Sequence, residues 1–219
     1  FCRRAKISGR TLSGMNIIIG DVDRPLVIKV ASISSARIQV YFIDNEDYFR
    51  RKQISYDTDG KFFEDNGQRA IFFARGVLET VKKLRWAPDV IHCQGWISHL
   101  VPLYLKKAYN GDPIFSGSRI VTSLYNEAAE EKLSPSLKDN VLFGGIKPAD
   151  VSLLEEPTGI NLAKTAALYS DGIILGDKDV APELVKFCEE RSMPILPFSE
   201  DSISSGRYIE EYDGFYQQL

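Results

Sequence analysis

Histidine and cysteine are the side chains most often used for nucleophilic and metal chemistry, and this sequence contains few of them. Its histidines are His92 and His99, and its cysteines are Cys2, Cys93 and Cys188. These residues do not provide the ligand spacing of a zinc site, and no nucleophile elbow is present from which a serine or cysteine triad could be built. We therefore predict no metal site and no bound cofactor, and the sequence alone assigns no catalytic residue.

The two histidines have different expected roles. His92 lies near the end of a buried apolar run, where a histidine is more often a hydrogen-bonded structural residue than a catalyst. His99 lies one turn into the next predicted helix, where a solvent-facing or capping role is an equally good interpretation.

Amide and aromatic side chains follow two short apolar runs that we predict to be parallel strands. Gln94-Gly95-Trp96 follows Val90–Cys93, and Tyr125-Asn126 follows Arg119–Leu124. Ligands of open α/β sheets lie beyond the carboxyl ends of the strands, so Gln94, Gly95, Trp96, Tyr125 and Asn126 are the predicted substrate-binding residues. The amides can donate and accept hydrogen bonds, Trp96 or Tyr125 can stack on a ligand, and Gly95 permits a tight turn or a close ligand approach. In the alternative interpretation, Trp86 and Trp96 are core residues and Gly95 is an ordinary turn glycine.

Two predicted helices position the first strand end. The first has an apolar stripe at helical spacing, and Arg75, Glu79, Lys82 and Lys83 are expected on its opposite face. Asp65 followed by Gln68 fits a capping box, which predicts a start near Asn66, and Pro88 is expected to end the helix. The second helix is predicted over Ile97–Lys107. The residues of the stripe are Ala70, Phe73, Ala74, Val77, Val81 and Leu84.

The rest of the chain alternates between runs typical of strands and of helices. Three strands form a predicted antiparallel meander near the start, and a charged segment after the second strand end is expected to be a loop with short helices over the site. A helix, a strand, a helix, a proline-flanked edge strand and a final helix broken near Gly206 and Gly214 complete the chain. We therefore predict an α/β fold, with a mostly parallel sheet, helices on both faces and an antiparallel meander near the start. The predicted ranges are Met15–Ile19, Leu26–Ala31, Arg37–Ile43, 127–158, Asn161–Tyr169, Ser170–Leu175, Pro182–Glu190, Pro194–Pro197 and Ile203–Gln218.

The segment Asp57-Thr58-Asp59-Gly60 has the composition of a calcium-binding loop. In the register of such a loop, however, the first and twelfth positions are Ser55 and Asn66 rather than acidic residues. We therefore predict a hairpin or loop tip at this position.

The composition is that of an ordinary globular protein and argues against several classes of partner. The 27 basic and 30 acidic residues give a net charge of −3, so nothing favours nucleic acid or an anionic membrane. No apolar run approaches the roughly 18 residues that a membrane-spanning helix needs. The odd number of widely spaced cysteines indicates a reducing compartment, and we expect a soluble cytoplasmic protein. Because the chain begins at Phe1 rather than methionine, we also expect it to be truncated at its N-terminus.

The segment Arg69–Lys107 resembles bacterial glycogen synthases and plant starch synthases. The run from Trp86 to Trp96 is similar to the family's Trp-x-Pro-Asp-Ile-Ile-His-x-His-Asp-Trp, and Val101-Pro102-Leu103 matches a family helix that contains Val-Pro-Leu. The run Tyr41–Asn45 is also similar to a strand end of the family. The resemblance covers about residues 12–190 and is greatest to a short, one-domain group of glycogen synthases from Bacteroidetes-type bacteria.

The resemblance implies a fold and an activity. The fold would be one Rossmann-like half of a two-domain glycosyltransferase, with residues 1–219 forming a single N-terminal, acceptor-side domain. In the family, glucose passes from a sugar nucleotide to the end of an α-1,4-glucan. The implied partner is therefore an α-glucan or maltooligosaccharide, and the implied donor is ADP-glucose.

The sequence departs from the family at the positions that matter most for chemistry. Gln94 stands where the family has its second histidine, Gly95 replaces the aspartate, and Tyr125 replaces a histidine. The family's Lys-x-Gly-Gly loop is not found, because Gly144-Gly145 has Leu142 at the lysine position. The nucleotide-binding C-terminal half is not found either. These departures imply a glucosyltransferase domain completed by a separate nucleotide-binding glycosyltransferase chain or, alternatively, a catalytically inactive glucan-binding or regulatory module.

Overall fold

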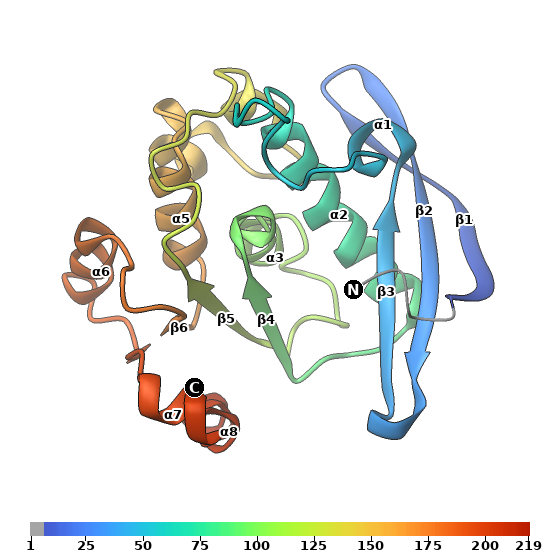
Figure 1. Cartoon of the computed structure of the whole chain (residues 1–219). Coiled ribbons are helices and arrows are strands. Elements are labelled where there is room, and N and C mark those ends of the chain that lie inside the picture. Colours follow the sequence, from blue (N-terminus) through green and yellow to red (C-terminus); the bar gives the residue numbers. More distant parts are fainter. Residues whose placement is uncertain (1–6) are drawn as a thin grey trace.

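The computed structural model describes residues 7–219, which form two β-sheets on either side of the long helix α2 (Asn66–Leu84) (Figure 1). One sheet has three antiparallel strands, and the other has four parallel strands. The predicted α/β fold class is confirmed. The meander, however, forms a sheet of its own rather than an extension of the parallel sheet.

The antiparallel sheet is the predicted meander. Its strands β1 (Ile7–Ile19), β2 (Val22–Ile33) and β3 (Ile38–Asp44) pair in chain order and extend beyond the predicted ranges. Alternation along β2 directs Leu26 and Ile28 inward, where both are buried in the core that includes α2. After β3, the side chain of Asn45 caps the short helix α1 (Glu46–Phe49) by accepting hydrogen bonds from two of its backbone N–H groups.

The parallel sheet places its strands in chain order, β4 (Val90–Gln94), β5 (Arg119–Leu124), β6 (Gly172–Leu175) and β7 (Ile195–Leu196). The predicted edge strand near Pro194 is confirmed as β7. At the other edge lies β4, and no described residue pairs with its outer side. The interior strand β5 is buried from Ile120 to Leu124, whereas Val90, Ile91 and His92 in β4 are only half-buried.

Helices cover both faces of this sheet, as predicted (Figure 1). Successive residues of a strand point to opposite faces, so Ile173 packs with α5 and α6, whereas Ile174 packs against Phe215 of α8. The helix α3 lies on the same face as α5 and covers the end of the sheet that β4 forms. The helices are α3 (Val101–Lys107), α5 (Gly159–Leu168), α6 (Pro182–Glu189), α7 (Glu200–Ser205) and α8 (Tyr208–Gln218).

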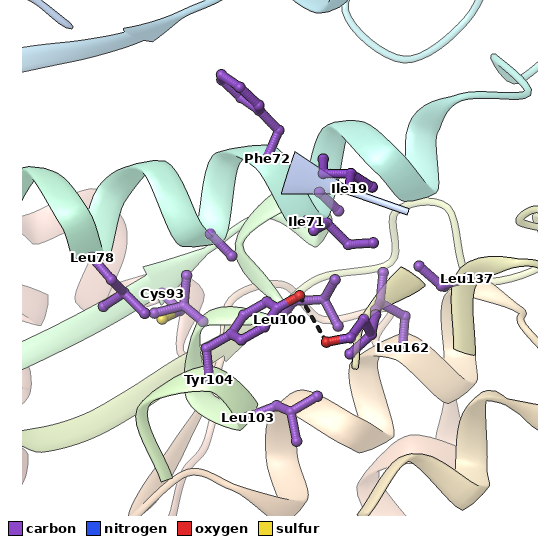
Figure 2. Close-up of a cluster of buried hydrophobic side chains, with 14 of the residues drawn as sticks. Ile19, Ile71, Phe72, Leu78, Cys93, Leu100, Leu103, Tyr104, Leu137 and Leu162 are labelled. Carbon is purple, nitrogen blue, oxygen red and sulfur yellow. Dashed lines mark hydrogen bonds between the residues drawn. The ribbon is translucent and has the colours of Figure 1, made fainter. Parts of the chain in front are cut away.

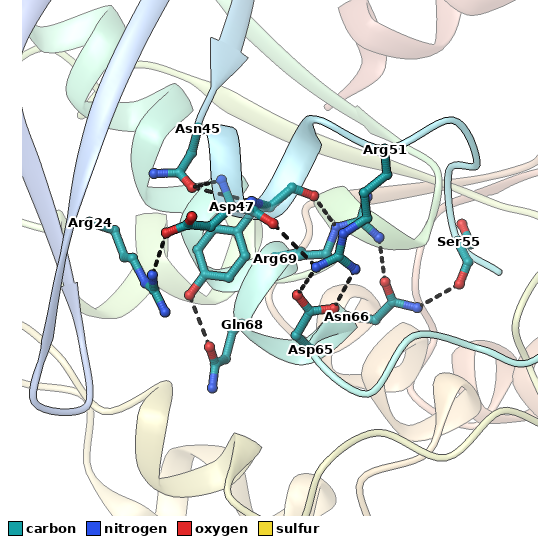
Figure 3. A network of polar contacts seen from close by, with 10 residues as sticks. Arg24, Asn45, Asp47, Arg51, Ser55, Asp65, Asn66, Gln68 and Arg69 are labelled. Atoms are coloured by element: carbon teal, nitrogen blue, oxygen red, sulfur yellow. Dashed lines mark hydrogen bonds and ion pairs between the residues drawn. The ribbon is translucent and has the colours of Figure 1, made fainter. Parts of the chain in front are cut away.

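The helix α2 begins at Asn66 as predicted, but the predicted capping box is wrong. Asp65 makes no capping bond and instead forms an ion pair with Arg51, while Gln68 accepts a hydrogen bond from the hydroxyl of Tyr48 (Figure 3). The helix also ends before Pro88. Its last residue is Leu84, because Arg85 takes the left-handed conformation with φ 55°.

The predicted polar face of α2 is wrong at Arg75, which is buried. Its guanidinium donates a hydrogen bond to the carbonyl of Ile18 and lies 3.8 Å from the ring centroid of Phe143. The helix lies between two sheets and therefore has two apolar faces. Ile71 and Leu78 belong to the main core (Figure 2), although neither lies in the predicted stripe.

Two other predicted helices are divided differently. The helix predicted over Ile97–Lys107 is a 3-10 turn (Trp96–Ser98) followed by α3, whose first turn contains Pro102. The C-terminal helix is broken at Gly206 as predicted, but α8 runs through Gly214 without interruption. Within the described residues, no helix has the length and apolar character needed to cross a membrane.

Short elements fill the connections. The predicted loop over 127–158 contains the helix α4 (Leu137–Asn140) and a 3-10 segment (Pro148–Glu155). A further 3-10 turn (Ser34–Ala36) joins β2 to β3. The segment Asp57–Gly60 is the tip of a hairpin, as predicted, because Tyr56 and Phe62 pair across it and the Asp57 side chain accepts from two backbone N–H groups of the turn.

Candidate strand-end site

The carboxyl ends of β4, β5 and β6 lie side by side, which brings the predicted amides to one edge of the sheet. Gln94 is level with Ser123, and Leu124 is level with Leu175. The chain after β5 is fixed to the chain after β6, since the Asn126 backbone N–H donates to the carboxylate of Asp177 at 2.7 Å. Gln94 and Asn126 are both exposed at this edge.

Gly95 forms the turn after β4 with a positive φ of 78°, a backbone conformation that favours glycine. A Cβ atom at this position would lie 3.3 Å from a carboxylate oxygen of Glu127. The same oxygen accepts a hydrogen bond of 2.9 Å from the Trp96 backbone N–H. The prediction of a tight turn is confirmed. Sequence reasoning missed Glu127, because it is 31 residues away and lies in a segment without periodicity.

Trp96 is a packing residue. Its side chain is 6% exposed, its ring centroid lies 5.4 Å from that of Phe62, and its Nε1 donates to the hydroxyl of Ser55 at 3.1 Å. The alternative interpretation of Trp96 as a core residue is therefore correct, and its ring has no free face for a ligand. The same interpretation is wrong for Trp86, which is 60% exposed.

Tyr125 lies over the start of the segment after β6. Gly176 makes room for it, since a Cβ atom at Gly176 would lie 2.2 Å from Cε1 of the Tyr125 ring. The tyrosine is only half-buried and retains an exposed part beside Asn126. Among the predicted aromatic residues, Tyr125 is thus the one that can contact a ligand.

His92 is held by hydrogen bonds on both ring nitrogens. Its Nε2 lies 2.7 Å from the hydroxyl of Ser123, and its Nδ1 lies 2.8 Å from the hydroxyl of Tyr216 and 3.3 Å from the amide nitrogen of Gln94. An amide nitrogen only donates, so Nδ1 accepts and Nε2 carries the proton that is donated to Ser123. Burial lowers the pKa of His92 from 6.5 to about 4, so the ring is neutral at pH 7. The structural role expected for His92 is confirmed.

His99 does not have the solvent-facing or capping role given in the sequence interpretation. It is 3% exposed, and its ring lies near the backbone of Ser123 without a hydrogen bond of normal geometry at either nitrogen. Burial lowers its pKa to about 4, opposed only by that backbone. The cause is the 3-10 turn before α3, which starts the helix later than predicted and turns position 99 inward.

A cavity of about 660 Å³ opens beside the strand ends, and Asn126 is the one predicted site residue that lines it. The cavity is acidic, with Glu130, Glu131 and Glu183 in its wall and no lysine or arginine among the described lining residues. Most of this wall could not be predicted from the sequence, because it comes from a hairpin, an irregular loop and two helix starts. The remaining lining residues are Tyr56, Ala128, Ala129, Thr158, Ile160, Ala181 and Pro182.

A parallel sheet with helices on both faces defines a Rossmann-like α/β domain, and in such domains ligands lie at the carboxyl edge of the sheet. The sequence matches the family model of the starch synthase catalytic domain over residues 5–193, and the chain belongs to this family. The match ends before α7 and α8, so the Tyr216 contact to His92 comes from outside it.

Glycogen synthases are among the similar proteins. The chain is 33% identical to the glycogen synthase of Chlorobium limicola over 177 residues, which are 80% of this chain and 35% of that protein. It is 36% identical to the glycogen synthase of Chlorobium phaeobacteroides over 199 residues, which are 82% of this chain and 38% of that protein. The chain thus spans little more than a third of the length of these relatives.

The fold is also similar to a solved structure, the catalytic domain of starch synthase IV from Arabidopsis thaliana bound to ADP and acarbose. The TM-score is 0.66 at 15% sequence identity, and the match covers 86% of this chain and 40% of that one. At this level of identity the similarity supports the fold alone.

Proposed function

We propose that this chain is the acceptor-side domain of a glycogen or starch synthase-like glucosyltransferase, and that it binds the end of an α-1,4-glucan at the strand ends of β4 and β5. Family membership supports the reaction class. The single observation that carries the site is the juxtaposition of exposed Gln94 and Asn126 with half-buried Tyr125 at one sheet edge. Two amides that donate and accept, beside an aromatic ring, suit a sugar with many hydroxyl groups.

The charge of the site supports the acceptor role rather than donor binding. Glucose transfer breaks the bond between the sugar and a diphosphate, so negative charge develops on the leaving group and requires nearby donors or cations. The cavity beside Asn126 carries three carboxylates, one of which, that of Glu183, forms an ion pair with Lys164. A neutral glucan can bind there, whereas a diphosphate would be repelled. The donor, ADP-glucose in this proposal, would therefore be bound by a separate nucleotide-binding polypeptide.

The chain's own residues can position a glucan but provide little acid-base chemistry. Gln94 cannot titrate or carry charge, and His92 has both nitrogens engaged and a pKa of about 4. Neither Gln94 nor Gly95 replaces the charged pair that the sequence pattern of the family has at these positions. Catalysis would then depend on groups supplied by the nucleotide-binding polypeptide.

Chemical-shift mapping with maltoheptaose tests the proposal. We expect saturable shifts at Gln94, Tyr125 and Asn126, and no shifts at the same residues with ADP at equal concentration. If maltoheptaose produces no shifts at millimolar concentration, or if ADP occupies these strand ends, the acceptor-side assignment is wrong.

The competing function is a catalytically inactive glucan-binding or regulatory module, which Gln94 and Gly95 favour. Adding the separately produced C-terminal half of the Chlorobium limicola glycogen synthase, together with labelled ADP-glucose and glycogen, distinguishes the two. Incorporation that requires both polypeptides and falls in an Asn126→Ala variant supports the split enzyme. Glucan binding without incorporation supports the inactive module.

We also infer a cytoplasmic location. It is supported by the odd, widely spaced cysteines, of which Cys93 and Cys188 are buried and unpaired. Growth of a tagged chain in the source cells, followed by fractionation, tests it. Recovery of the tag outside the cytoplasmic fraction would contradict it.

A further inference from the structure

The helix α8 reaches the strand ends from outside the part of the chain that matches the family model. It packs on the second face of the parallel sheet, where buried Phe215 lies in one apolar cluster with Val121 and Ile174 (Figure 1). The hydroxyl of Ser202 in α7 donates a hydrogen bond of 2.6 Å to the carboxylate of Glu211 in α8. The helix is therefore attached to the sheet and to the helix before it.

Three tyrosines one turn apart, Tyr208, Tyr212 and Tyr216, form a column along α8. The ring centroids of successive tyrosines are 5.6 Å and 6.4 Å apart. The imidazole of His92 packs against the end of this column, with its centroid 5.8 Å from those of Tyr212 and Tyr216 in edge-to-face geometry. Tyr125 lies nearby, since burial and then the neighbouring Tyr125 phenol raise the pKa of Tyr212. The column therefore adjoins the ends of both β4 and β5.

The hydroxyl of Tyr216 completes a chain of hydrogen bonds that ends at Gln94. It donates to Nδ1 of His92 at 2.8 Å, and the opposite ring nitrogen, Nε2, donates to the hydroxyl of buried Ser123 at 2.7 Å. The amide nitrogen of Gln94 donates to the same Nδ1 at 3.3 Å. His92 and Gln94 are two positions apart on β4, so their side chains lie on the same face of the sheet. The nitrogen of the Gln94 amide is therefore turned toward the imidazole.

We propose that Tyr216 is a positioning residue of the strand-end site, because its hydroxyl fixes the tautomer of His92 and thereby the orientation of the Gln94 amide. This inference rests on the proposed function, in which Gln94 binds the glucan. If Nδ1 carried the ring proton, the Gln94 amide would have to turn its oxygen toward the imidazole, and the donor and acceptor offered to a ligand would be exchanged. An unheld glutamine would also lose rotational freedom on binding, which costs affinity.

The first test measures maltoheptaose affinity by isothermal titration calorimetry with the full chain. Tyr216→Phe removes only the hydroxyl and should weaken binding about three- to tenfold, as expected when a held side chain becomes free to rotate. Tyr208→Phe is the matched control, since Tyr208 is a half-buried tyrosine two turns earlier on the same helix, and this variant should bind as the parent does.

A double-mutant cycle shows whether Tyr216 acts through Gln94. In a Gln94→Ala background, Tyr216→Phe should have no further effect on maltoheptaose affinity, because the side chain that it positions is gone. A general loosening of the fold would instead lower the affinity by the same factor in both backgrounds, and that result would overturn the proposal.

Nitrogen NMR of the free protein provides a readout that does not depend on glucan. In the parent at pH 7, Nε2 of His92 should have the chemical shift of a protonated nitrogen and Nδ1 that of an unprotonated one. Tyr216→Phe should give a mixture of the two tautomers. The side-chain amide of Gln94 should relax as an ordered group in the parent and become more mobile in this variant.

The outcomes separate this inference from the function on which it rests. A protonated Nδ1 or a freely rotating Gln94 amide in the parent overturns the positioning role, even if no variant can be folded. Equal maltoheptaose affinities of the parent and Tyr216→Phe overturn it as well, and the acceptor role then stands. If the parent binds no maltoheptaose, the acceptor role itself fails, and the inference fails with it.

Discussion

The amides at the strand ends are the residues on which glucan binding depends most directly in our proposal. Gln94 and Asn126 are exposed and lie on neighbouring strand ends, so neither has a large structural role. Replacing both by alanine should weaken maltoheptaose binding about tenfold or more, since each lost hydrogen bond is worth roughly 1 kcal/mol. Chemical-shift titration of the double variant measures the change, and its melting temperature should stay close to that of the parent. Unchanged affinity would remove these amides from the site.

The buried histidines make stability depend on pH. Burial lowers the pKa of His92 and His99 from 6.5 to about 4, so between these values the unfolded chain binds more protons than the folded one. The stabilisation is complete above about pH 6.5 and is lost as the pH falls toward 4. At pH 5 the expected loss is about 2 kcal/mol for each ring.

Substituting the fully buried ring isolates this effect. We expect the free energy of unfolding of His99→Leu to fall less than that of the parent between pH 7.5 and pH 5, because leucine cannot take up a proton in the unfolded chain. Urea unfolding at the two pH values measures the difference, and carboxylates contribute equally to both proteins. Parallel losses in parent and variant would show that His99 titrates normally.

Individual side chains were the hardest features to predict. The sequence located Gln94, Gly95, Tyr125 and Asn126 at strand ends, because apolar runs and turn residues are local signals. It could not show that Tyr216 reaches His92 across 124 positions, or that Glu127 binds the turn at Trp96. Tyr56 and Glu131 come from irregular segments, where no periodicity marks a residue as part of a wall.

The helix α2 shows that contacts between distant residues also limit the prediction of a whole helix. Its length and start were predictable from its apolar spacing, but a helix between two sheets buries more than one face. Leu78 is 1% exposed, whereas Val77 in the predicted stripe is half-buried and lines a cavity of about 270 Å³ beside β4. Likewise, Asp65 and Gln68 have the spacing of a capping box, yet Arg51 and Tyr48 supply stronger competing partners.

Because of this arrangement, a charged residue should destabilise the protein to different degrees at neighbouring positions of α2. We expect Leu78→Asp to unfold the protein or cost several kcal/mol, since a charge would be buried without a partner. Val77→Asp should cost less, because its side chain can turn toward the cavity and water. Urea denaturation of both variants, compared with the exposed-site control Lys83→Asp, provides the measurement. Equal losses at positions 77 and 78 would mean that the helix is buried evenly on both sides.

At the scale of the whole molecule, the 219-residue chain should bind glucan without elongating it. Among the described residues that line the acidic cavity there is no lysine or arginine to stabilise a leaving diphosphate, and Gln94 and Gly95 provide no charge. We expect no incorporation of labelled glucose from ADP-glucose into glycogen above a control without protein. Steady incorporation by the purified chain would show that it holds a complete catalytic site.

The outer side of β4 has a consequence for how the protein behaves in concentrated solution. Among the described residues no strand pairs with this edge, and the backbone N–H and C=O groups of an unpaired edge can pair with the same edge of another molecule, which is how ordered aggregates begin. Here the strand is only five residues long, and Pro88 before it and Gly95 after it oppose its extension. Edge pairing between molecules is therefore limited to a short stretch, and warming that loosens α2 above it would expose the apolar side chains that make such pairing irreversible.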